Sequence, residues 1–507
     1  MTKVKFGPFC LDFERRELLR HGAVVALGSR AIDILCALVS ANGDLVTKDE
    51  LMDLVWPGLT VEENNLQVHI SALRKALETD KDGQSYVVTV PRRGYRFIGL
   101  STSTGGRHSD ARAPKDRDPP DKPSIAVLPF ENLGGDREQE YFADGLTEDL
   151  ITDLSQVPGL FVIARNSSFA YKGKSVDVRS IARNLGVRHV LEGSARRDAG
   201  RVRINVQLID AIDGGLQWAE RFDRSLDDVF RVQDEVTAKI VEALVGRITV
   251  AQIPERKRPA NLEAYDLCVR GRALFFQSPQ AGREARLMFE RAVALDPEFA
   301  EAHRWLAFSL QNAWFLWGEP MDPNRRLAVA AVQKAIAIDP NDAGNHWIYG
   351  LILTRGHQWA EAVAEFAVAL KLDPNHADAW AMRSELMVLS GRPTDALADI
   401  EKALRLNPHP PGLYYWMLGQ AQYLDRQYGR AVHSLRREET YRTGSRRTLA
   451  ASLAQLGRID EARREAEMFM VSNPHFRIRQ WVELVSFRDE AALQHFVDGY
   501  RKAGLPE

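Results

Sequence analysis

Apolar residues recur at helical spacing between residues 64 and 77, and polar residues take the opposite side of the same segment. At about 100° per residue, one face collects four aliphatic side chains: Leu66, Ile70, Leu73 and Leu77. The other face collects four polar side chains: Asn64, Gln67, Ser71 and Lys75. The pattern predicts an amphipathic helix with one face in a core and one face that can meet a polar partner.

Two shorter helices are predicted before this one. Ser29 is expected to cap the first, which ends near Asn42-Gly43 and has its apolar positions at Ile32, Leu35, Leu38 and Val39. Thr47 and Glu50 form a capping box for the second, which Trp56-Pro57 ends. Residues 86–97 then have the pattern of a basic β-hairpin. Three helices and a terminal hairpin predict a winged helix.

Two strings in this region point to a known family. Val-His-Ile-Ser-Ala-Leu-Arg-Lys at 68–75 and Thr-Val-Pro-Arg-Arg-Gly-Tyr-Arg-Phe at 89–97 resemble the core and ending of the OmpR/PhoB-type effector domain. The resemblance covers the first hundred residues and implies a winged helix that binds DNA. Asn64-Asn65-Leu66-Gln67 departs from the usual family sequence, and Ala72 replaces a common arginine. The site preference of better-known members therefore does not carry over.

The polar face of the helix suits base reading in a major groove. Amide side chains present a paired donor and acceptor that match adenine, whereas cations farther along the helix and on the wing hold phosphates or the minor groove. These cations set affinity and its salt dependence. The predicted DNA-contacting residues are Asn64, Asn65, Gln67, Val68, Ser71, Arg74, Lys75, Arg92, Arg93 and Arg96.

The resemblance also implies partners besides double-stranded promoter DNA. Family members contact RNA polymerase through the loop before the recognition helix, which here carries Trp56, Gly58, Thr60, Glu62 and Glu63. They also bind repeated half-sites as two protomers, so a homodimer is expected. A phosphoacceptor receiver domain is not evident in the sequence, so control by direct phosphorylation is not expected.

A second folded segment is predicted after a tether. Residues 101–122 are rich in Ser, Thr, Gly, Arg, Asp and Pro without periodic apolar positions, which is typical of a flexible linker. Residues 123–250 alternate strand and helix patterns and predict a small α/β domain. The strings Ile-Ala-Val-Leu-Pro-Phe at 125–130 and Val-Leu-Glu-Gly-Ser at 190–194 resemble the TolB-like amino-terminal domain.

Four carboxylates in this domain recur near helical spacing: Asp144, Glu148, Asp149 and Asp153. Such a cluster can hold a metal ion or do acid–base work. The favoured interpretation is structural, with Asp144 or Thr147 capping a helix and the acids that follow favouring its N-terminal dipole. The sequence shows no phosphate loop, zinc-protease motif or nucleophile elbow. We therefore expect no enzyme activity and no cofactor.

The last part of the chain, 260–507, repeats itself. Six alanines mark equivalent places at spacings of 43, 34, 34, 35 and 31 residues: Ala285, Ala328, Ala362, Ala396, Ala431 and Ala462. Proline follows twelve residues after most of them. This is the tetratricopeptide period and predicts a solenoid of six helix pairs. Its curved inner surface is expected to bind a protein or peptide, and the insertion at 314–323 is either a contact loop or an extended helix with a turn.

Composition adds limits. The chain has 507 residues, 45% hydrophobic, with a net charge of −2, which suits three domains with cores of their own. Its three cysteines, Cys10, Cys36 and Cys268, are too scattered for a metal motif and favour reduced thiols. An apolar run long enough to span a membrane and a signal peptide are not found, so a cytoplasmic protein without a membrane partner is expected.

The predicted fold class is multidomain, α+β and all-α: a winged helix, an α/β domain and a tetratricopeptide solenoid. This order resembles HilA/CadC-like regulators without a transmembrane segment, and implies a transcriptional regulator whose C-terminal two-thirds receive a signal or a partner. Two alternatives stay open. One is a tetratricopeptide scaffold that uses the winged helix for protein contact, and the other is a nucleotide-dependent enzyme in the middle domain.

Overall fold

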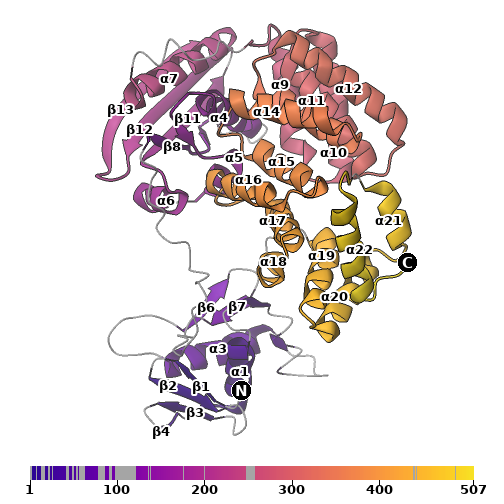
Figure 1. Cartoon of the computed structure of the whole chain (residues 1–507). Helices are drawn as coiled ribbons and strands as arrows, with labels where there is room; N and C mark the ends of the chain where they lie inside the picture. The colour runs from indigo at the N-terminus through magenta and orange to yellow at the C-terminus, as the bar shows by residue number, and fades with distance from the viewer. Residues whose placement is uncertain are drawn as a thin grey trace. The chain divides into compact units, whose positions relative to one another are not determined.

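The computed structural model describes residues 3–6, 8–12, 17–20, 23–25, 27–40, 45–47, 51–52, 55, 63–77, 86–90, 94–97, 122–134, 136, 139–174, 176–198, 200–246, 257–437, 440, 442–485 and 487–507. They divide into two compact units, 1–111 and 112–507, and each is described by itself (Figure 1). The predicted linker 101–122 lies outside the described residues except for Lys122.

The first unit begins with an antiparallel meander of four short strands. In order they are β1 (Lys3–Phe6), β2 (Phe9–Asp12), β3 (Glu17–Arg20) and β4 (Ala23–Val24). Helix α1 (Ser29–Ser40), strand β5 (Leu45–Thr47) and helix α3 (Glu63–Ala76) follow. Strands β6 (Val87–Val90) and β7 (Gly94–Phe97) complete a second antiparallel sheet in the order β5-β7-β6. The predicted helix and hairpin are both confirmed.

The N-terminal caps predicted for two helices of this unit were Ser29 and Thr47. Ser29 is the first residue of α1 rather than its cap, because the Ile32 amide donates to the Gly28 carbonyl at 3.1 Å and moves the first turn back by one residue. Thr47 is the last residue of strand β5 and is paired with Gly94. Because residues 48–50 lie outside the described residues, the capping box of Thr47 and Glu50 stays a prediction. Residues 51, 52 and 55 are helical, and Glu50 lies outside the described residues.

The second unit contains a mixed sheet with strand order β10-β8-β11-β12-β13. Its strands are β8 (Ser124–Val127), β10 (Phe161–Val162), β11 (His189–Asp198), β12 (Arg201–Asp210) and β13 (Gly215–Ser225). Strand β8 pairs parallel with β10 and β11, and the other two pairings are antiparallel; the short strand β9 (Glu131–Asn132) adds to β11. The alternation predicted from the sequence therefore forms an α/β sheet.

Helices cover both faces of this sheet. Helices α4 (Glu140–Ser155) and α7 (Val229–Leu244) share one core with it. Helix α6 (Val178–Leu185) shares the other core, which also contains residues from the helical repeats such as Ile400 and Tyr414. Helix α5 (Arg165–Phe169) was not predicted. Because the sheet and the repeats bury side chains against each other, they form one unit.

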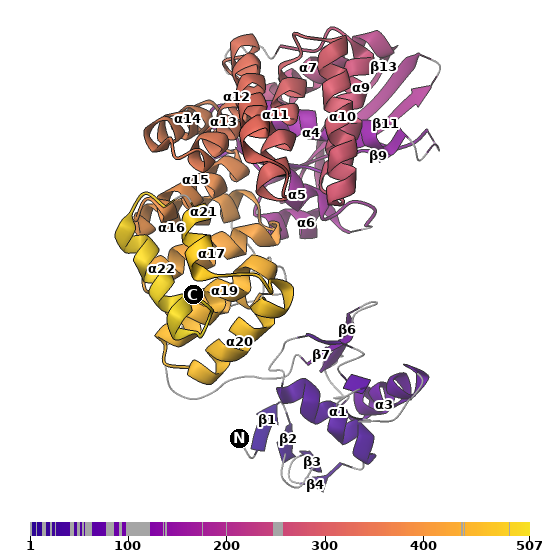
Figure 2. The ribbon, with the colours of Figure 1, turned by 90° about the vertical axis from the view of Figure 1, so that its right-hand side faces the viewer.

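Within the part of the chain that the structure describes, the repeats form six helix pairs, as predicted. Figure 2 shows how helices of successive pairs stack along this part of the chain. They are α9 (Leu262–Phe275) with α10 (Pro279–Leu295), α11 (Ala300–Phe315) with α12 (Met321–Ile338), α13 (Ala343–Arg355) with α14 (Trp359–Leu372), α15 (Ala377–Leu389) with α16 (Pro393–Leu406), α17 (Gly412–Leu424) with α18 (Tyr428–Leu435), and α19 (Arg442–Gln455) with α20 (Ile459–Ser472). All six marker alanines lie in second helices with 0% of their surface exposed. Glycines permit close helix approach: a Cβ at Gly419 would lie 2.4 Å from Leu435 Cγ.

The inserted segment resolves into extended helices with a turn. Helix α11 runs to Phe315 and α12 begins at Met321, so only five residues connect them. Within that turn, Trp317 packs against Gly282, and Glu319 accepts hydrogen bonds from Arg283 and Arg286 at 3.0 and 2.9 Å. Of the two interpretations left open by the sequence, the structure supports the extended helix.

Two more helices close the chain, α21 (Ile478–Leu484) and α22 (Glu490–Lys502). Helix α22 contacts α15, α17 and α19, which are the first helices of the last three pairs. The Tyr423 hydroxyl donates to the His495 carbonyl at 2.8 Å, and their rings stack at 4.7 Å. The side of the solenoid formed by these first helices is therefore covered by the chain's own C-terminal helix. Among the described residues, no helix has the length and apolar character needed to cross a membrane.

Candidate nucleic-acid interface

Helix α3 is held by its apolar face. Leu66 and Leu73 are fully buried and Ile70 and Leu77 are 2% exposed, all in the core that also receives Leu35 of α1 and Phe97 of β7. This burial of four aliphatic side chains fixes the rotation of the helix about its axis. The wheel drawn from the sequence thus predicted the buried face correctly.

The opposite side of α3 faces outward. Val68 is 64% exposed, and Ser71 and Lys75 are exposed as well. The backbones of Asn64, Asn65 and Gln67 lie in the first part of this helix, on the predicted polar face; their side chains are outside the described set. Glu63 is the first residue of α3 rather than part of the preceding loop. The structure therefore presents one helix face that a groove of DNA can receive.

Arg74 connects this helix to the wing. Its Nε donates to the Val87 carbonyl at 2.8 Å and its Nη2 donates to Thr89 Oγ1 at 2.6 Å, both on strand β6. From the sequence, Arg74 was predicted only to contact a phosphate. Its hydrogen bonds to the wing were not predicted, because they join residues 13 and 15 positions apart and no local pattern indicates them. A guanidinium with five donors can brace the wing and still offer a donor to another group.

The wing itself is strands β6 and β7. Arg96 is half-buried on β7, where its backbone pairs with Val88 of β6 and Leu45 of β5. Arg92 and Arg93, between the two strands in the sequence, lie outside the described residues. So do the other members of the predicted polymerase-contact loop: Trp56, Gly58, Thr60 and Glu62. The roles of these residues stay predictions.

The carboxylates of α4 are the second candidate site, and the structure surrounds them with cations and donors. Asp149 is 2% exposed. Its Oδ2 accepts from the Tyr265 hydroxyl at 2.6 Å and from Gln233 Nε2 at 3.2 Å. Burial first, and the nearby Asp149 charge second, raise the pKa of Tyr265 well above its usual value. The phenol therefore stays protonated and remains a donor to this carboxylate.

Arg272 of helix α9 lies at the centre of this cluster. It forms ion pairs with Glu148 at 3.0 Å, with Asp149 at 3.5 Å and with Glu301 of α11. Burial by itself lowers the pKa of Arg272, but these three carboxylates outweigh burial and raise it well above its usual value. The guanidinium is thus a permanent buried charge that ties α4 of the sheet domain to the first two helix pairs.

The remaining two carboxylates are also paired. Lys172 Nζ lies 2.6 Å from Asp144 Oδ1 and 2.8 Å from Glu140, and Arg258 Nη2 lies 2.6 Å from Asp153. The predicted caps are wrong: α4 begins at Glu140, so Asp144 and Thr147 lie inside the helix, where the Thr147 hydroxyl donates to the Ala143 carbonyl at 2.8 Å. Among the described residues, no group of three or more His, Cys, Asp or Glu side chains is arranged to hold a metal ion.

The partners of these acids were not predictable from the sequence. Tyr265, Arg272 and Arg258 lie 105 to 124 positions from the α4 carboxylates that they bind. Neither helical periodicity nor local spacing reports contacts at that separation. The sequence offers one local indication, which is that Arg272 stands on a helix that otherwise buries aromatic and aliphatic residues. This indication does not identify the partner of Arg272.

Two protein-family models match the chain. Residues 22–97 match the model described as transcriptional regulatory protein, C terminal. Residues 121–239 match the model described as HilA/YgeH-like transcriptional regulator, second domain. The first match contains α1, α3 and the wing, and the second contains the mixed sheet with α4 to α6 and most of α7.

Curated relatives match parts of the chain. "Putative adenylate cyclase 3" of Rhizobium meliloti (strain 1021) is 51% identical over 239 residues, which cover 46% of this chain and 41% of that protein. "Transcriptional activator CadC" of Escherichia coli (strain K12) is 33% identical over 96 residues, which cover 19% of each protein. The chain thus spans less than half the length of either relative.

A solved structure of the DNA-binding domain of Escherichia coli CadC is 32% identical, with a TM-score of 0.19, and covers 20% of this chain and 94% of that domain. The two family models together account for the segments on either side of the linker, and each names a class of transcriptional regulator. The chain therefore joins an OmpR/PhoB-type winged helix to a second domain of the HilA/YgeH-like type and continues into helical repeats.

Proposed function

We propose that this protein is a sequence-specific DNA-binding transcriptional regulator. One observation carries the proposal: in the segment that matches a regulatory-protein family, α3 buries its apolar face and exposes the other beside a β-hairpin. In this proposal α3 enters the major groove, and Asn64, Asn65 and Gln67 read base edges. The hairpin contacts the backbone or the minor groove, and the protein acts in the cytoplasm, where the chromosome is.

Arg74 adds a mechanical element to this proposal. Because its guanidinium joins α3 to β6, the helix and the wing keep a fixed separation. A helix and a wing held at a fixed distance are already arranged for binding. The wing then does not have to be ordered when DNA binds, so no binding free energy is lost in ordering it. RNA polymerase contact by the loop at 56–63 and binding as two protomers on repeated half-sites are further parts of the proposal.

The test is a selection of genomic DNA fragments by the full-length protein. We expect a defined sequence to be enriched, and Arg92→Ala/Arg93→Ala to weaken binding by about 1–3 kcal/mol for each lost contact, with a smaller dependence on salt. Arg201→Ala/Arg203→Ala, on the mixed sheet, is the matched control and should leave retention unchanged. Weak, sequence-independent retention shared by both variants would contradict the proposal and favour the scaffold interpretation.

We further propose that the protein is not a nucleotide-dependent enzyme, although one relative carries a cyclase name. The support is that the four acids of the predicted cluster on α4, Asp144, Glu148, Asp149 and Asp153, are each matched with cations or donors from the chain itself. Carboxylates neutralised in this way are poorly placed to bind metal ions. Conversion of ATP to cyclic AMP by the full-length protein, lost in Asp144→Ala, would overturn this part.

A further inference from the structure

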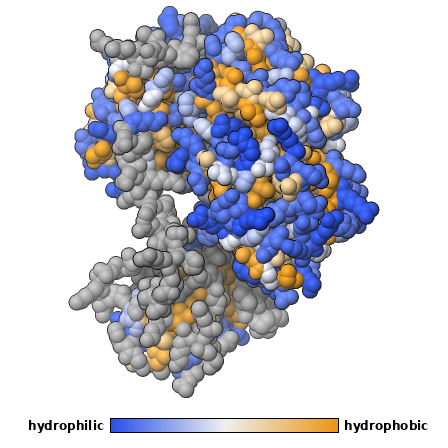
Figure 3. All heavy atoms as spheres, in the orientation of Figure 1, coloured by the Kyte–Doolittle hydropathy of each residue, from blue (hydrophilic) through white to orange (hydrophobic). Residues whose placement is uncertain are grey.

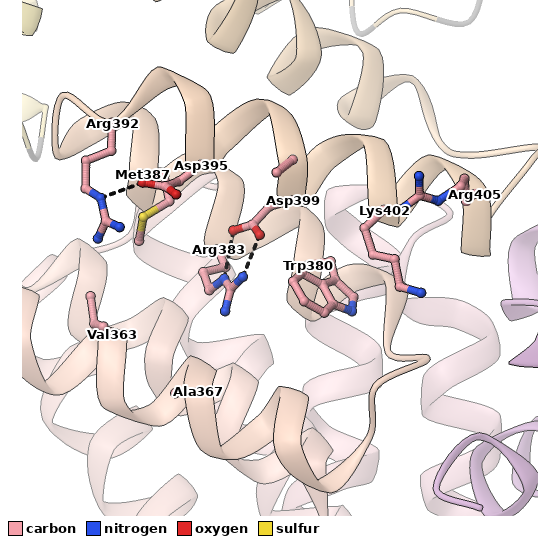
Figure 4. Close-up of a pocket in the computed structure, with 11 residues that line it drawn as sticks. Val363, Ala367, Trp380, Arg383, Met387, Arg392, Asp395, Asp399, Lys402 and Arg405 are labelled. Atoms are coloured by element: carbon pink, nitrogen blue, oxygen red, sulfur yellow. Dashed lines mark hydrogen bonds and ion pairs between the residues drawn. The ribbon is translucent and has the colours of Figure 1, made fainter. Parts of the chain in front are cut away.

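A groove runs along the repeats between two second helices. Helices α14 and α16 form its walls and α15 forms its floor, and it encloses about 540 Å³ (Figure 4). Helix α22, whose residues are all described, contributes none of the residues that line this groove, although it contacts the floor helix α15. Figure 3 shows apolar areas between hydrophilic ones on one face of this unit. A partner of the last repeats therefore has this groove open to it while α22 stays in place.

The charges in the groove are unevenly distributed. Arg392 pairs with Asp395 at 2.8 Å, and Arg383 binds both carboxylate oxygens of Asp399 at 2.7 and 2.5 Å. Beyond these pairs, Lys402 and Arg405 line the other end. Within the described ranges, no ion pair joins either of them to a carboxylate. One end of the groove is thus electrically balanced and the other is cationic.

The surroundings of Lys402 sharpen this asymmetry. Its Nζ lies 5.9 Å from the centre of the Phe161 ring on β10. Burial first, then the positive charges of Lys122 and Arg405, lower the pKa of Lys402. Cations that repel one another in a partly buried place are stabilised when an anion binds between them. Lys122 is the last residue of the predicted linker and lies two residues before β8, so this end of the groove adjoins the entry of the chain into the unit.

The middle of the groove is apolar and elongated. Val363 and Ala367 of α14 face Ala398 of α16 across Trp380 and Met387 of α15. From Arg392 to Arg405 the α16 wall runs about 20 Å at a rise of roughly 1.5 Å per residue. An extended chain covers that length in about six residues at roughly 3.3 Å each. A compact metabolite is shorter, so the dimensions favour a peptide.

We propose that this groove binds an extended peptide segment of a partner protein, with apolar side chains in the middle and a carboxylate at the end beside Lys402 and Arg405. The carboxylate belongs either to an Asp or Glu side chain or to the peptide's own C-terminus. This proposal rests on the proposed regulatory function, because it assigns the receiving role to α14, α15 and α16. It also places the bound carboxylate next to Lys122, at the end of the linker from the DNA-binding unit.

The experiment uses full-length protein and a positional-scanning library of N-acetylated hexapeptides, synthesised once as C-terminal amides and once as free acids. We expect enriched peptides to carry Asp or Glu at one end and Leu, Val or Phe in the middle. Enrichment in the amide library assigns the site to a side-chain carboxylate, and enrichment only in the free-acid library assigns it to a chain terminus. No enrichment in either library would overturn the proposal.

Charge reversal supplies the control. Lys402→Glu/Arg405→Glu should weaken binding of the best peptide by about tenfold or more for each lost charge-assisted contact. Arg291→Glu/Arg326→Glu makes the same change in net charge on exposed positions of α10 and α12 and should leave affinity unchanged. Lys402→Gln, a milder change, keeps the test valid if the double reversal unfolds. Equal binding by Lys402→Gln and wild type would contradict the proposal.

DNA retention separates this proposal from the one on which it rests. The Lys402 variants should bind the selected DNA like wild type, since their substitutions lie outside the winged helix. If DNA is bound and no peptide is enriched, only the groove proposal fails. If peptides are enriched and no DNA is bound, the regulatory function fails and the protein is a peptide-binding scaffold.

Discussion

Helices α3 and α4 both carry polar side chains at helical spacing, yet they use them in opposite ways. On α3 the polar face is outside, with Val68 64% exposed beside Ser71 and Lys75. On α4 the acidic face is inside, with Asp149 2% and Asp153 7% exposed. The difference is in what the rest of the chain brings to each face. Arginines and a tyrosine from distant segments cover α4, whereas α3 receives its core contacts only on the apolar side.

This contrast teaches how to judge a polar helix face. A buried carboxylate is tolerable only when cations or donors meet it, so burial with complete pairing indicates a structural role. On α3, Val68, Ser71 and Lys75 are exposed to solvent, and an exposed polar helix face suits a ligand. The four predictions below test the contrast from either side, beginning with the largest expected effect.

Asp149→Ala should lower the free energy of unfolding by about 3–5 kcal/mol, because it leaves the buried Arg272 and Tyr265 without a shared partner. The measurement is the guanidinium midpoint followed by tryptophan fluorescence. Asp198→Ala removes the exposed partner of Arg196 and should change that free energy by less than about 0.5 kcal/mol. Equal stability of the two variants would show that the α4 face is not a structural one.

Gln67→Ala should leave stability unchanged and weaken binding of the selected DNA by about 1–3 kcal/mol, because it removes an amide that we propose to read a base edge. The affinity for a DNA site with a changed base should fall less than the affinity for the best site. The difference in affinity between the two sites, which is the specificity, should therefore decrease. Gln207→Ala, an exposed amide on β12, is the control. A loss of affinity that is equal for all sequences would place Gln67 on the phosphates instead of the bases.

Arg74→Ala should cost the winged helix about 1–2 kcal/mol of stability, since two hydrogen bonds between α3 and β6 are lost. Lys75→Ala, its exposed neighbour, should keep stability and only reduce the salt dependence of DNA binding by about one unit of slope. Thermal unfolding and salt titration separate the two effects. Identical behaviour of the two variants would remove the bracing role from Arg74.

Asp144→Asn should have the smallest effect, below about 1 kcal/mol. Burial raises the pKa of Asp144 even though Lys172 opposes it, so ionising this carboxyl works against folding above its unfolded pKa. Burial lowers the pKa of Lys172, but Asp144 and Glu140 raise it overall, so pairing stabilises the lysine. Burial of the Asp144 carboxylate therefore lowers the free energy of unfolding, whereas its pairing with Lys172 raises it, and the net effect is small. If Asp144→Asn lowered the free energy of unfolding as much as Asp149→Ala, the burial of the carboxylate would not decide the size of the effect.

Much of the architecture follows from local patterns. The alanines in second helices, the proline turns after them and the strand–helix alternation of residues 123–250 each depend on near neighbours in the sequence. Helix starts were less certain: Ser29 lies one residue inside α1, and α4 begins four residues before Asp144. A cap depends on which carbonyl accepts the first helical hydrogen bond, and several residues in a row can satisfy that role.

The faces of these elements were only partly predictable. The wheel for α3 found its buried side because aliphatic side chains gather there whatever the fold. The same reasoning found a row of acidic residues on α4 but not its structural role. The ion-pair partners of these acids come from α9 and from Arg258, which are distant in the sequence. The brace from Arg74 to the wing was missed for the same reason.

By itself, the sequence determined the winged helix, the strand and helix order, the repeat period and the polar side of α3, because each depends on spacing within one element. Only the tertiary structure decided that α4 is neutralised, that α22 covers the first helices of the last repeats, and that the groove along α16 ends in Lys402 and Arg405, for which the described residues supply no ion-pair partner. The physical reason is that burial and charge pairing depend on different elements of the chain, which for Arg272 and Glu148 lie 124 residues apart, and no local pattern records their approach.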